Sequence, residues 1–182
     1  MGGGGSQPPH QIVVTDQTGG AVVDEIAGID VIDKFRGDYA ALSNFAPAQV
    51  WLEGRPYRSV EHAYQAAKTL DIYERARVRL AATPREARRI GRSVALRPDW
   101  DCSRLGVMRR LLVQKFAQAN FAEILLGTGD AELIEGNDWG DVFWGVCQGE
   151  GKNYLGRMLM DIRVEIHVAR ERFAAGGESV AL

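Results

Sequence analysis

Two long stretches in the second part of the chain repeat apolar residues at every third or fourth position. The first stretch contains Leu105, Met108, Leu111, Leu112 and Phe116, and the second contains Leu155, Leu159, Ile162, Ile166 and Ala169. This spacing places apolar side chains on one face of an α-helix. Asn153, just before the second stretch, is of a type that often begins helices. The second two-thirds of the chain are therefore predicted to be mostly helical.

Two shorter helices are predicted before them. The first begins after Tyr57, with Ser59 as its cap and an apolar face formed by Ala63, Ala66, Ala67 and Leu70. The second begins at a capping box, Thr83–Glu86, with proline at the first helical position. Gly91 lies where a left-handed residue would end that helix.

Short strands are predicted only near the amino terminus, at residues 29–35 and at residues 50–52 before a turn at Gly54. Residues 1–28, which open with a linker-like glycine run, are expected to form a flexible segment. Residues 29–173 are expected to form one domain, followed by a frayed tail at 174–182. The predicted fold is a compact, mostly α (α+β) single domain with a small β element near the amino terminus.

The composition excludes several classes of protein. With 46% hydrophobic and 25% charged residues, the chain resembles an ordinary globular protein. A net charge of -2 gives no general attraction to nucleic acid. The two cysteines, Cys102 and Cys147, lack metal-ligand spacing, so we expect reduced thiols and a cytoplasmic protein. No apolar run approaches the roughly 20 residues that span a bilayer, so no membrane association is expected.

The helix predicted after Ser59 carries an unusual polar stripe. Glu61, Gln65 and Lys68 are spaced so that a carboxylate, an amide and an ammonium share one face. This stripe either lines a polar pocket or is an exposed helix face.

Two later segments also combine residue types that bind ligands. Trp100 follows a proline-stiffened loop and is either a platform for a base or a lid on the core. Residues 137–145 contain two acids and three large aromatics between glycines, which indicates irregular backbone. The amides at the helix start near Asn153 are candidates for binding an anion.

Arginines are concentrated between Tyr73 and Arg97, a segment that contains eight arginines and only two glutamates. The cluster is either a solvated helix surface or a surface that faces phosphate.

Several of these segments occur together in a known order: Phe35–Tyr39, Leu42–Phe45, Ser59–Lys68, Arg97–Trp100, Asp141–Gly145 and Gly151–Met160. In this combination the chain resembles the NADAR superfamily, also called YbiA-like, from about Ile32 to Arg172. The resemblance implies a compact, mostly helical fold and an N-glycosidase, which hydrolyses the bond between ribose C1 and the nitrogen of a base.

The resemblance implies that Glu61, Trp100 and Asp141 are the functional residues. One carboxylate would activate water and the other would stabilise the sugar cation, an assignment that the sequence leaves open. Trp100 would stack on the base. We further expect substrate to be bound by Asn44, Lys68, Trp144, Lys152 and Asn153. No cofactor and no metal are expected.

Two substrate classes are attached to the family. One is guanine carrying ADP-ribose, or a related ADP-ribosylated nucleotide or nucleic acid, and the other is a ribosylamino pyrimidine phosphate of riboflavin synthesis. The arginine excess favours the first. A module that binds ADP-ribose or a nucleotide without cleaving it is the alternative to an enzyme, although two carboxylates beside a phosphorylated ligand argue against it.

Overall fold

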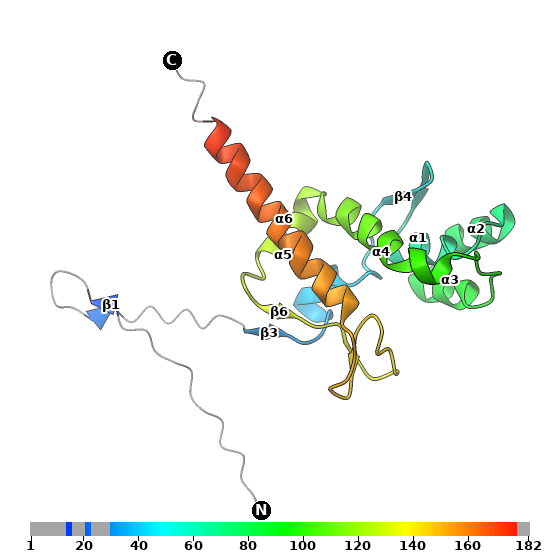
Figure 1. Cartoon of the computed structure of the whole chain (residues 1–182), viewed down its shortest axis with the longest axis horizontal. Helices are drawn as coiled ribbons and strands as arrows, with labels where there is room; N and C mark the ends of the chain where they lie inside the picture. The colour runs from blue at the N-terminus through cyan, green and yellow to red at the C-terminus, as the bar shows by residue number, and fades with distance from the viewer. Residues whose placement is uncertain (1–13, 16–20, 23–29, 178–182) are drawn as a thin grey trace, which may run out of the picture.

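Helices make up most of the structure, as the apolar spacing predicts. The computed structural model describes residues 14–15, 21–22 and 30–177. Figure 1 shows how these elements are arranged. The helices within the described residues are η1 (Gly37–Leu42), α1 (Val60–Ala66), α2 (Ile72–Arg79), α3 (Pro84–Gly91), α4 (Trp100–Phe116), α5 (Ala119–Leu126) and α6 (Tyr154–Gly177).

The strands are all two or three residues long and form separate pairs. Two pairs are antiparallel, β1 (Val14–Thr15) with β2 (Ala21–Val22) and β4 (Val50–Leu52) with β5 (Arg55–Tyr57). Two pairs are parallel, β3 (Val31–Ile32) with β6 (Glu132–Leu133) and β7 (Gly136–Asn137) with β8 (Val146–Cys147). The strand predicted at 29–35 is present in shorter form as β3, and the strand predicted at 50–52 is present with these bounds as β4. The strands β6, β7 and β8, which complete the parallel pairs, were not predicted.

The core surrounds α1, whose seven residues are all buried. Helix α1 packs against α2, α3 and α4, so it lies at the centre of the part of the molecule that these helices form (Figure 1). Ser59 caps α1 by accepting a hydrogen bond from the backbone N–H of His62, as predicted. Leu70 does not belong to its apolar face, because the helix ends before it and its side chain is 58% exposed.

Helix α3 begins as the sequence predicts and ends for a different reason. Thr83 Oγ1 accepts a hydrogen bond from the Glu86 backbone N–H, and the Glu86 carboxylate accepts one from the backbone N–H of Ala82. Gly91 is not left-handed. A Cβ at this position would lie 2.2 Å from Gln65 Oε1, so glycine is required here for α3 to approach α1.

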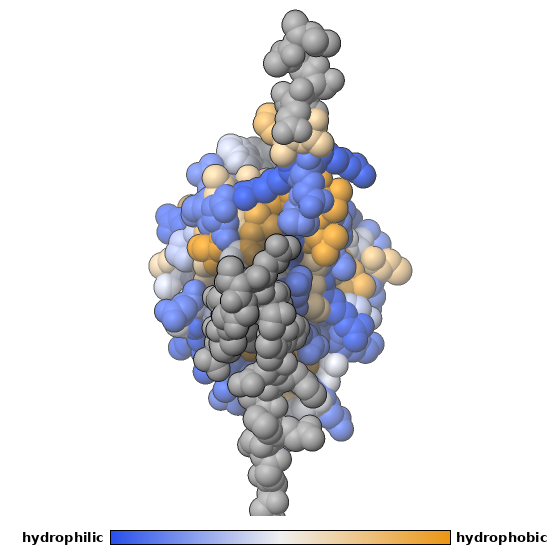
Figure 2. Space-filling model, turned by 90° about the vertical axis from the view of Figure 1, so that its left-hand side faces the viewer, coloured by the Kyte–Doolittle hydropathy of each residue, from blue (hydrophilic) through white to orange (hydrophobic). Residues whose placement is uncertain are grey.

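Helix α6 is longer than predicted. It extends through Gly177, so residues 174–177 are helical and not frayed, and the rest of the predicted tail lies outside the described residues. Most of the amino-terminal segment 1–28 also lies outside them, apart from β1 and β2. The face in Figure 2 mixes hydrophilic with hydrophobic residues. No helix in the described ranges combines the length and apolar character needed to cross a bilayer.

Candidate active site

One cavity of about 1020 Å³ collects most of the residues that the sequence singles out. Its walls come from the segment after η1, from α1 and α3, from the start of α4 and from the segment between β6 and α6. Six of the eight predicted site residues line it: Asn44, Glu61, Lys68, Trp100, Asp141 and Trp144. The polar stripe of α1 therefore faces this cavity and is not an exposed helix surface.

Glu61 is the most buried acid of the cavity, with only 3% of its surface exposed. Its Oε2 accepts a hydrogen bond from Asn44 Nδ2 at 2.6 Å, and its Oε1 accepts one from Gln65 Nε2 at 2.8 Å. Burial raises the pKa of Glu61, while the hydrogen bond from Gln65 and the positive charges of Arg88 and Lys68 oppose that rise. Glu61 is thus a fixed carboxyl whose negative charge is poorly solvated and would be stabilised by a nearby cation.

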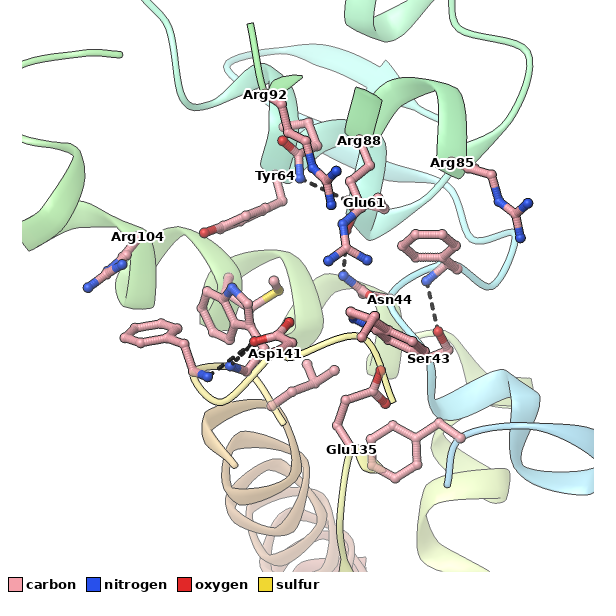
Figure 3. Close-up of a pocket in the computed structure, with 18 of the residues that line it drawn as sticks. Ser43, Asn44, Glu61, Tyr64, Arg85, Arg88, Arg92, Arg104, Glu135 and Asp141 are labelled. Carbon is pink, nitrogen blue, oxygen red and sulfur yellow. Dashed lines mark hydrogen bonds between the residues drawn. The ribbon is translucent and has the colours of Figure 1, made fainter. Parts of the chain in front are cut away.

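Asp141 is held by the backbone that follows it. Its Oδ1 accepts hydrogen bonds from the N–H groups of Phe143 at 3.1 Å and Trp144 at 2.9 Å. Asn137 supports this turn from the other side, since its amide oxygen accepts from the Asp141 N–H and its amide nitrogen donates to the Asp141 carbonyl. Asp141 is half-buried and enters the cavity opposite α1 (Figure 3).

The aromatic residues of the cavity differ in exposure. Trp100 is 7% exposed, and its ring lies 5.1 Å from that of Tyr64, which in turn meets Trp144 edge-on at 5.4 Å. Trp139, by contrast, is 50% exposed at the cavity, and the guanidinium groups of Arg36 and Arg88 each lie 5.9 Å from its ring centroid. Trp100 is therefore largely part of the core, and Trp139 offers the larger free indole surface.

Positive side chains border the cavity mainly along α3. Four of the eight clustered arginines line it, namely Arg85, Arg88, Arg89 and Arg92, and they are joined by Arg36 and Arg104. Figure 3 shows the labelled guanidinium groups of α3 on the Glu61 side of the cavity. Two other arginines of the cluster pair with acids, Arg75 with Glu53 and Arg97 with Asp99. The α3 half of the cluster therefore borders the cavity while Arg85, Arg89 and Arg92 are also exposed to solvent, and binding of phosphate there stays a prediction.

Lys68 lies beyond the end of α1 and still lines the cavity. Its Nζ donates to the Gly91 carbonyl at 3.5 Å and lies 5.8 Å from the ring centroid of Tyr64. Burial lowers the pKa of Lys68, and the negative charge of Glu61 opposes this.

Lys152 and Asn153 are not among the residues that line the cavity, which corrects their predicted position. Asn153 is buried, donates from Nδ2 to the Leu133 carbonyl at 2.8 Å and accepts from the Glu135 N–H at 3.1 Å. The backbone N–H groups of residues 152–155 donate to carbonyls of residues 142–145. The predicted anion site at this helix start is wrong, because the folded chain already occupies these donors.

Glu135 is the site residue that the sequence did not reveal. It follows β6, lines the cavity and points into it in Figure 3. Burial and the neighbouring charge of Asp141 raise the pKa of Glu135 to about 7. A single acid between the apolar pair Leu133–Ile134 and a glycine gives no sequence signal, and only its position opposite Glu61 marks it.

Among the described residues, no group of three His, Cys, Asp or Glu side chains is arranged to hold a metal ion. Metal independence stays a prediction that an activity assay must test.

Comparison with known proteins adds independent findings. The family model described as NADAR domain matches residues 33–167. The chain is 40% identical to "N-glycosidase Npun_R5314" of Nostoc punctiforme, over 70% of this chain and 86% of that protein. It is 37% identical to "N-glycosidase YbiA" of Escherichia coli, over 73% of this chain and 85% of that protein.

A solved structure agrees with these matches. The NMR structure of Escherichia coli YbiA aligns with a TM-score of 0.68 and 35% identity, covering 78% of this chain and 88% of that one. The chain also matches 23% of the length of the maize "Riboflavin biosynthesis protein PYRR, chloroplastic", at 36% identity and over 70% of this chain.

Proposed function

Since the chain belongs to the NADAR family and is an N-glycosidase, we propose that it removes ADP-ribose from guanine or from a related ADP-ribosylated nucleotide. The observation that carries this proposal is the distribution of charge in the cavity. Arginines from α3 lie along one side, and the carboxyl groups of Glu61 and Asp141 lie where a sugar would meet them. A pyrophosphate presents more negative charge than one monophosphate and can therefore pair with more of these arginines.

The size of the cavity is consistent with this substrate class. About 1020 Å³ is at the upper end of the usual range for ligand pockets. A substrate with two phosphates, two riboses and two bases, as in ADP-ribose attached to guanine, needs a large cavity of this kind.

In the reaction, the bond from the anomeric carbon to the base nitrogen breaks and positive charge develops on the sugar. Glu61 is suited to stabilise that charge, because its buried carboxylate gains most when a cation forms beside it. Asn44 and Gln65 fix its two oxygens and so set its orientation. Asp141 has one oxygen engaged by backbone amides, and we assign its other oxygen to the attacking water.

The aromatic residues are assigned to the departing base. Trp139 has an exposed indole at the cavity and would stack on a base. Trp100 would contribute only the part of its ring that reaches the cavity, while its packing on Tyr64 supports the wall.

Hydrolysis of a ribosylamino pyrimidine phosphate is the second candidate function. It is favoured by the similarity to the maize protein, which is named as a riboflavin biosynthesis protein. That substrate carries one phosphate and would leave part of the arginine border without a partner.

Both substrates are to be offered in parallel, guanine-ADP-ribosylated DNA and the ribosylamino pyrimidine phosphate, with EDTA present and with chromatography of the released base. We expect release from the modified DNA, and we expect the rate to fall steeply with added salt. Reversing charge in Arg85→Glu/Arg89→Glu should raise KM at least tenfold with little change in kcat. Arg77→Glu is the matched control, because Arg77 lies on α2 away from the cavity lining.

The other outcomes are equally informative. Salt-insensitive release from the pyrimidine alone would overturn the proposal in favour of the second candidate. Binding of ADP-ribose in a thermal-shift assay without release of any base would indicate a binding module.

A further inference from the structure

Glu135 is a third carboxyl in the cavity that the mechanism above leaves unused. Its main chain is fixed on both sides of the side chain. The Glu135 N–H donates to Asn153 Oδ1 at 3.1 Å, and the Glu135 carbonyl accepts from the Val146 N–H at 3.0 Å. Gly145 packs so closely that a Cβ there would lie 2.0 Å from the Glu135 carbonyl oxygen and 3.0 Å from Glu135 Cγ. The main chain that carries the Glu135 side chain is therefore held in place.

The three carboxyl groups differ in what they bind. Glu61 accepts hydrogen bonds from amide groups at both oxygens, and Asp141 accepts two from backbone N–H groups. Donors of this kind favour the carboxylate form. Within the described part of the chain, no hydrogen bond to the Glu135 carboxyl is found. Its oxygens are thus free for substrate or water.

The reaction also needs a group that donates a proton to the departing base, and neither Glu61 nor Asp141 has been assigned that role. A base that departs as an anion is a poor leaving group, and proton donation by a positioned acid accelerates its departure. The acid must be protonated near neutral pH and must face the base.

We propose that Glu135 is the general acid that protonates the departing base. As the bond from the anomeric carbon to nitrogen breaks, its electron pair stays on the base nitrogen, which takes the proton of the Glu135 carboxyl. The oxygen of water forms the new bond to the anomeric carbon and releases one proton to Asp141. That proton returns to Glu135 through solvent, so the sum is one water consumed and one N–H formed. The inference rests on the use of this cavity for N-glycoside hydrolysis and not on the identity of the base.

The surroundings of Glu135 agree with this role. Burial and the negative charges of Asp141 and Glu61 raise its pKa to about 7, while Arg36 and Arg88 oppose the rise. The protonated form of Glu135 is thus favoured by burial and by the two neighbouring carboxylates, against the two arginines.

The test compares Glu135→Gln with Glu132→Gln, which changes an exposed acid on β6 three residues away. Glu135→Gln should lower kcat for the natural base at least 100-fold. On a 4-nitrophenyl ribosyl 5-phosphate, whose leaving group departs without a proton, the same variant should retain activity within about fivefold of wild type. The decline of wild-type kcat above pH 7 should be absent from the variant.

Equal losses of Glu135→Gln on both leaving groups would overturn the proposal and indicate a structural role, as would activity close to that of wild type on the natural base. Titration of ¹³C-labelled side-chain carboxyls by NMR requires no substrate. A resonance that titrates near pH 7 and disappears in Glu135→Gln is expected, and its absence would overturn the proposal. If wild type cleaves no substrate, the proposed function fails and the general-acid role fails with it, whereas a failed titration with an active wild type overturns the role of Glu135 alone.

Discussion

Replacing Lys115 by methionine is expected to make the protein more stable at neutral pH and less active. Lys115 lies on α4 with no exposed surface, and its Nζ donates to the Ser43 carbonyl at 2.7 Å. The Nζ lies 5.0 Å from the ring centroids of Phe116 and Phe121, and the described residues form no ion pair with it. Burial lowers its pKa from 10.5 to about 7. The folded state therefore carries a cation at a position that disfavours charge.

The size and sign of the effect follow from this difference in pKa. Between pH 7 and 10.5 the unfolded chain binds a proton at Lys115 that the folded chain partly loses, so stability rises with pH across this range. At about 1.4 kcal/mol per pH unit, wild type is destabilised by about 4 kcal/mol at pH 7 and by less than about 1 kcal/mol at pH 10. Methionine removes this cost but leaves the Ser43 carbonyl without its donor, which costs about 1–3 kcal/mol.

Lys115→Met should therefore be more stable than wild type by about 2 kcal/mol at pH 7 and less stable by about 1 kcal/mol at pH 10. Urea unfolding of both proteins at each whole pH from 7 to 10 measures the difference, in which other titrating groups cancel. Lys34→Met, at an exposed lysine, is the control and should show no such trend. The kcat of Lys115→Met should fall, because Ser43 precedes Asn44, which orients Glu61. A stability difference that does not vary with pH would refute the reasoning, since Lys115 would then be charged equally in both states.

The remaining predictions concern side chains in the cavity. Glu61→Gln should fold normally and lose at least 100-fold in kcat, measured beside circular dichroism, because it removes the charge that stabilises the sugar cation; wild-type rates would exclude Glu61 from the reaction. Trp139→Ala should raise KM about 5- to 150-fold without changing the midpoint of thermal unfolding, as for one lost stacking contact. Trp100→Ala should instead destabilise folding by about 3–5 kcal/mol, with partial recovery in Trp100→Phe, because the indole is buried against Tyr64. Equal effects of the Trp139 and Trp100 variants on KM, with unchanged stability, would contradict this division.

The helices that the sequence predicts are those with a long apolar stripe or a clear cap. Helices α4 and α6 have the stripe, and Met108, Leu112 and Leu159 are buried as expected. Helices α2 and α5 were not predicted. The first has three arginines and one glutamate among its eight residues, and the second is a mostly apolar stretch of eight residues that is too short to show a helical period. Local patterns report a helix when it is long enough for its apolar stripe to repeat or when a clear capping sequence precedes it, as before α1 and α3.

The site was predictable where residue types cluster in the sequence. Glu61 and Lys68 lie in one dense segment and Asp141 in another, and all three line the cavity. Asn153 was misplaced, because a helix start offers free amides only if no other part of the chain bonds them, and residues 142–145 do so here. Glu135 was missed for the related reason that its burial and most of its charged neighbours, Glu61, Arg36 and Arg88, come from parts of the chain that are distant in sequence.

The close approaches at Gly91 and Gly145 have a consequence for systematic mutagenesis of this protein. Neither glycine has an atom to offer to the reaction, yet a methyl group at Gly91 would collide with Gln65 and one at Gly145 with Glu135. In a library scored by activity alone, both positions should therefore be as intolerant as Glu61. Scoring the same library for protein abundance as well would separate them, because glycine substitutions should reduce both scores, whereas Glu61→Gln should reduce only activity.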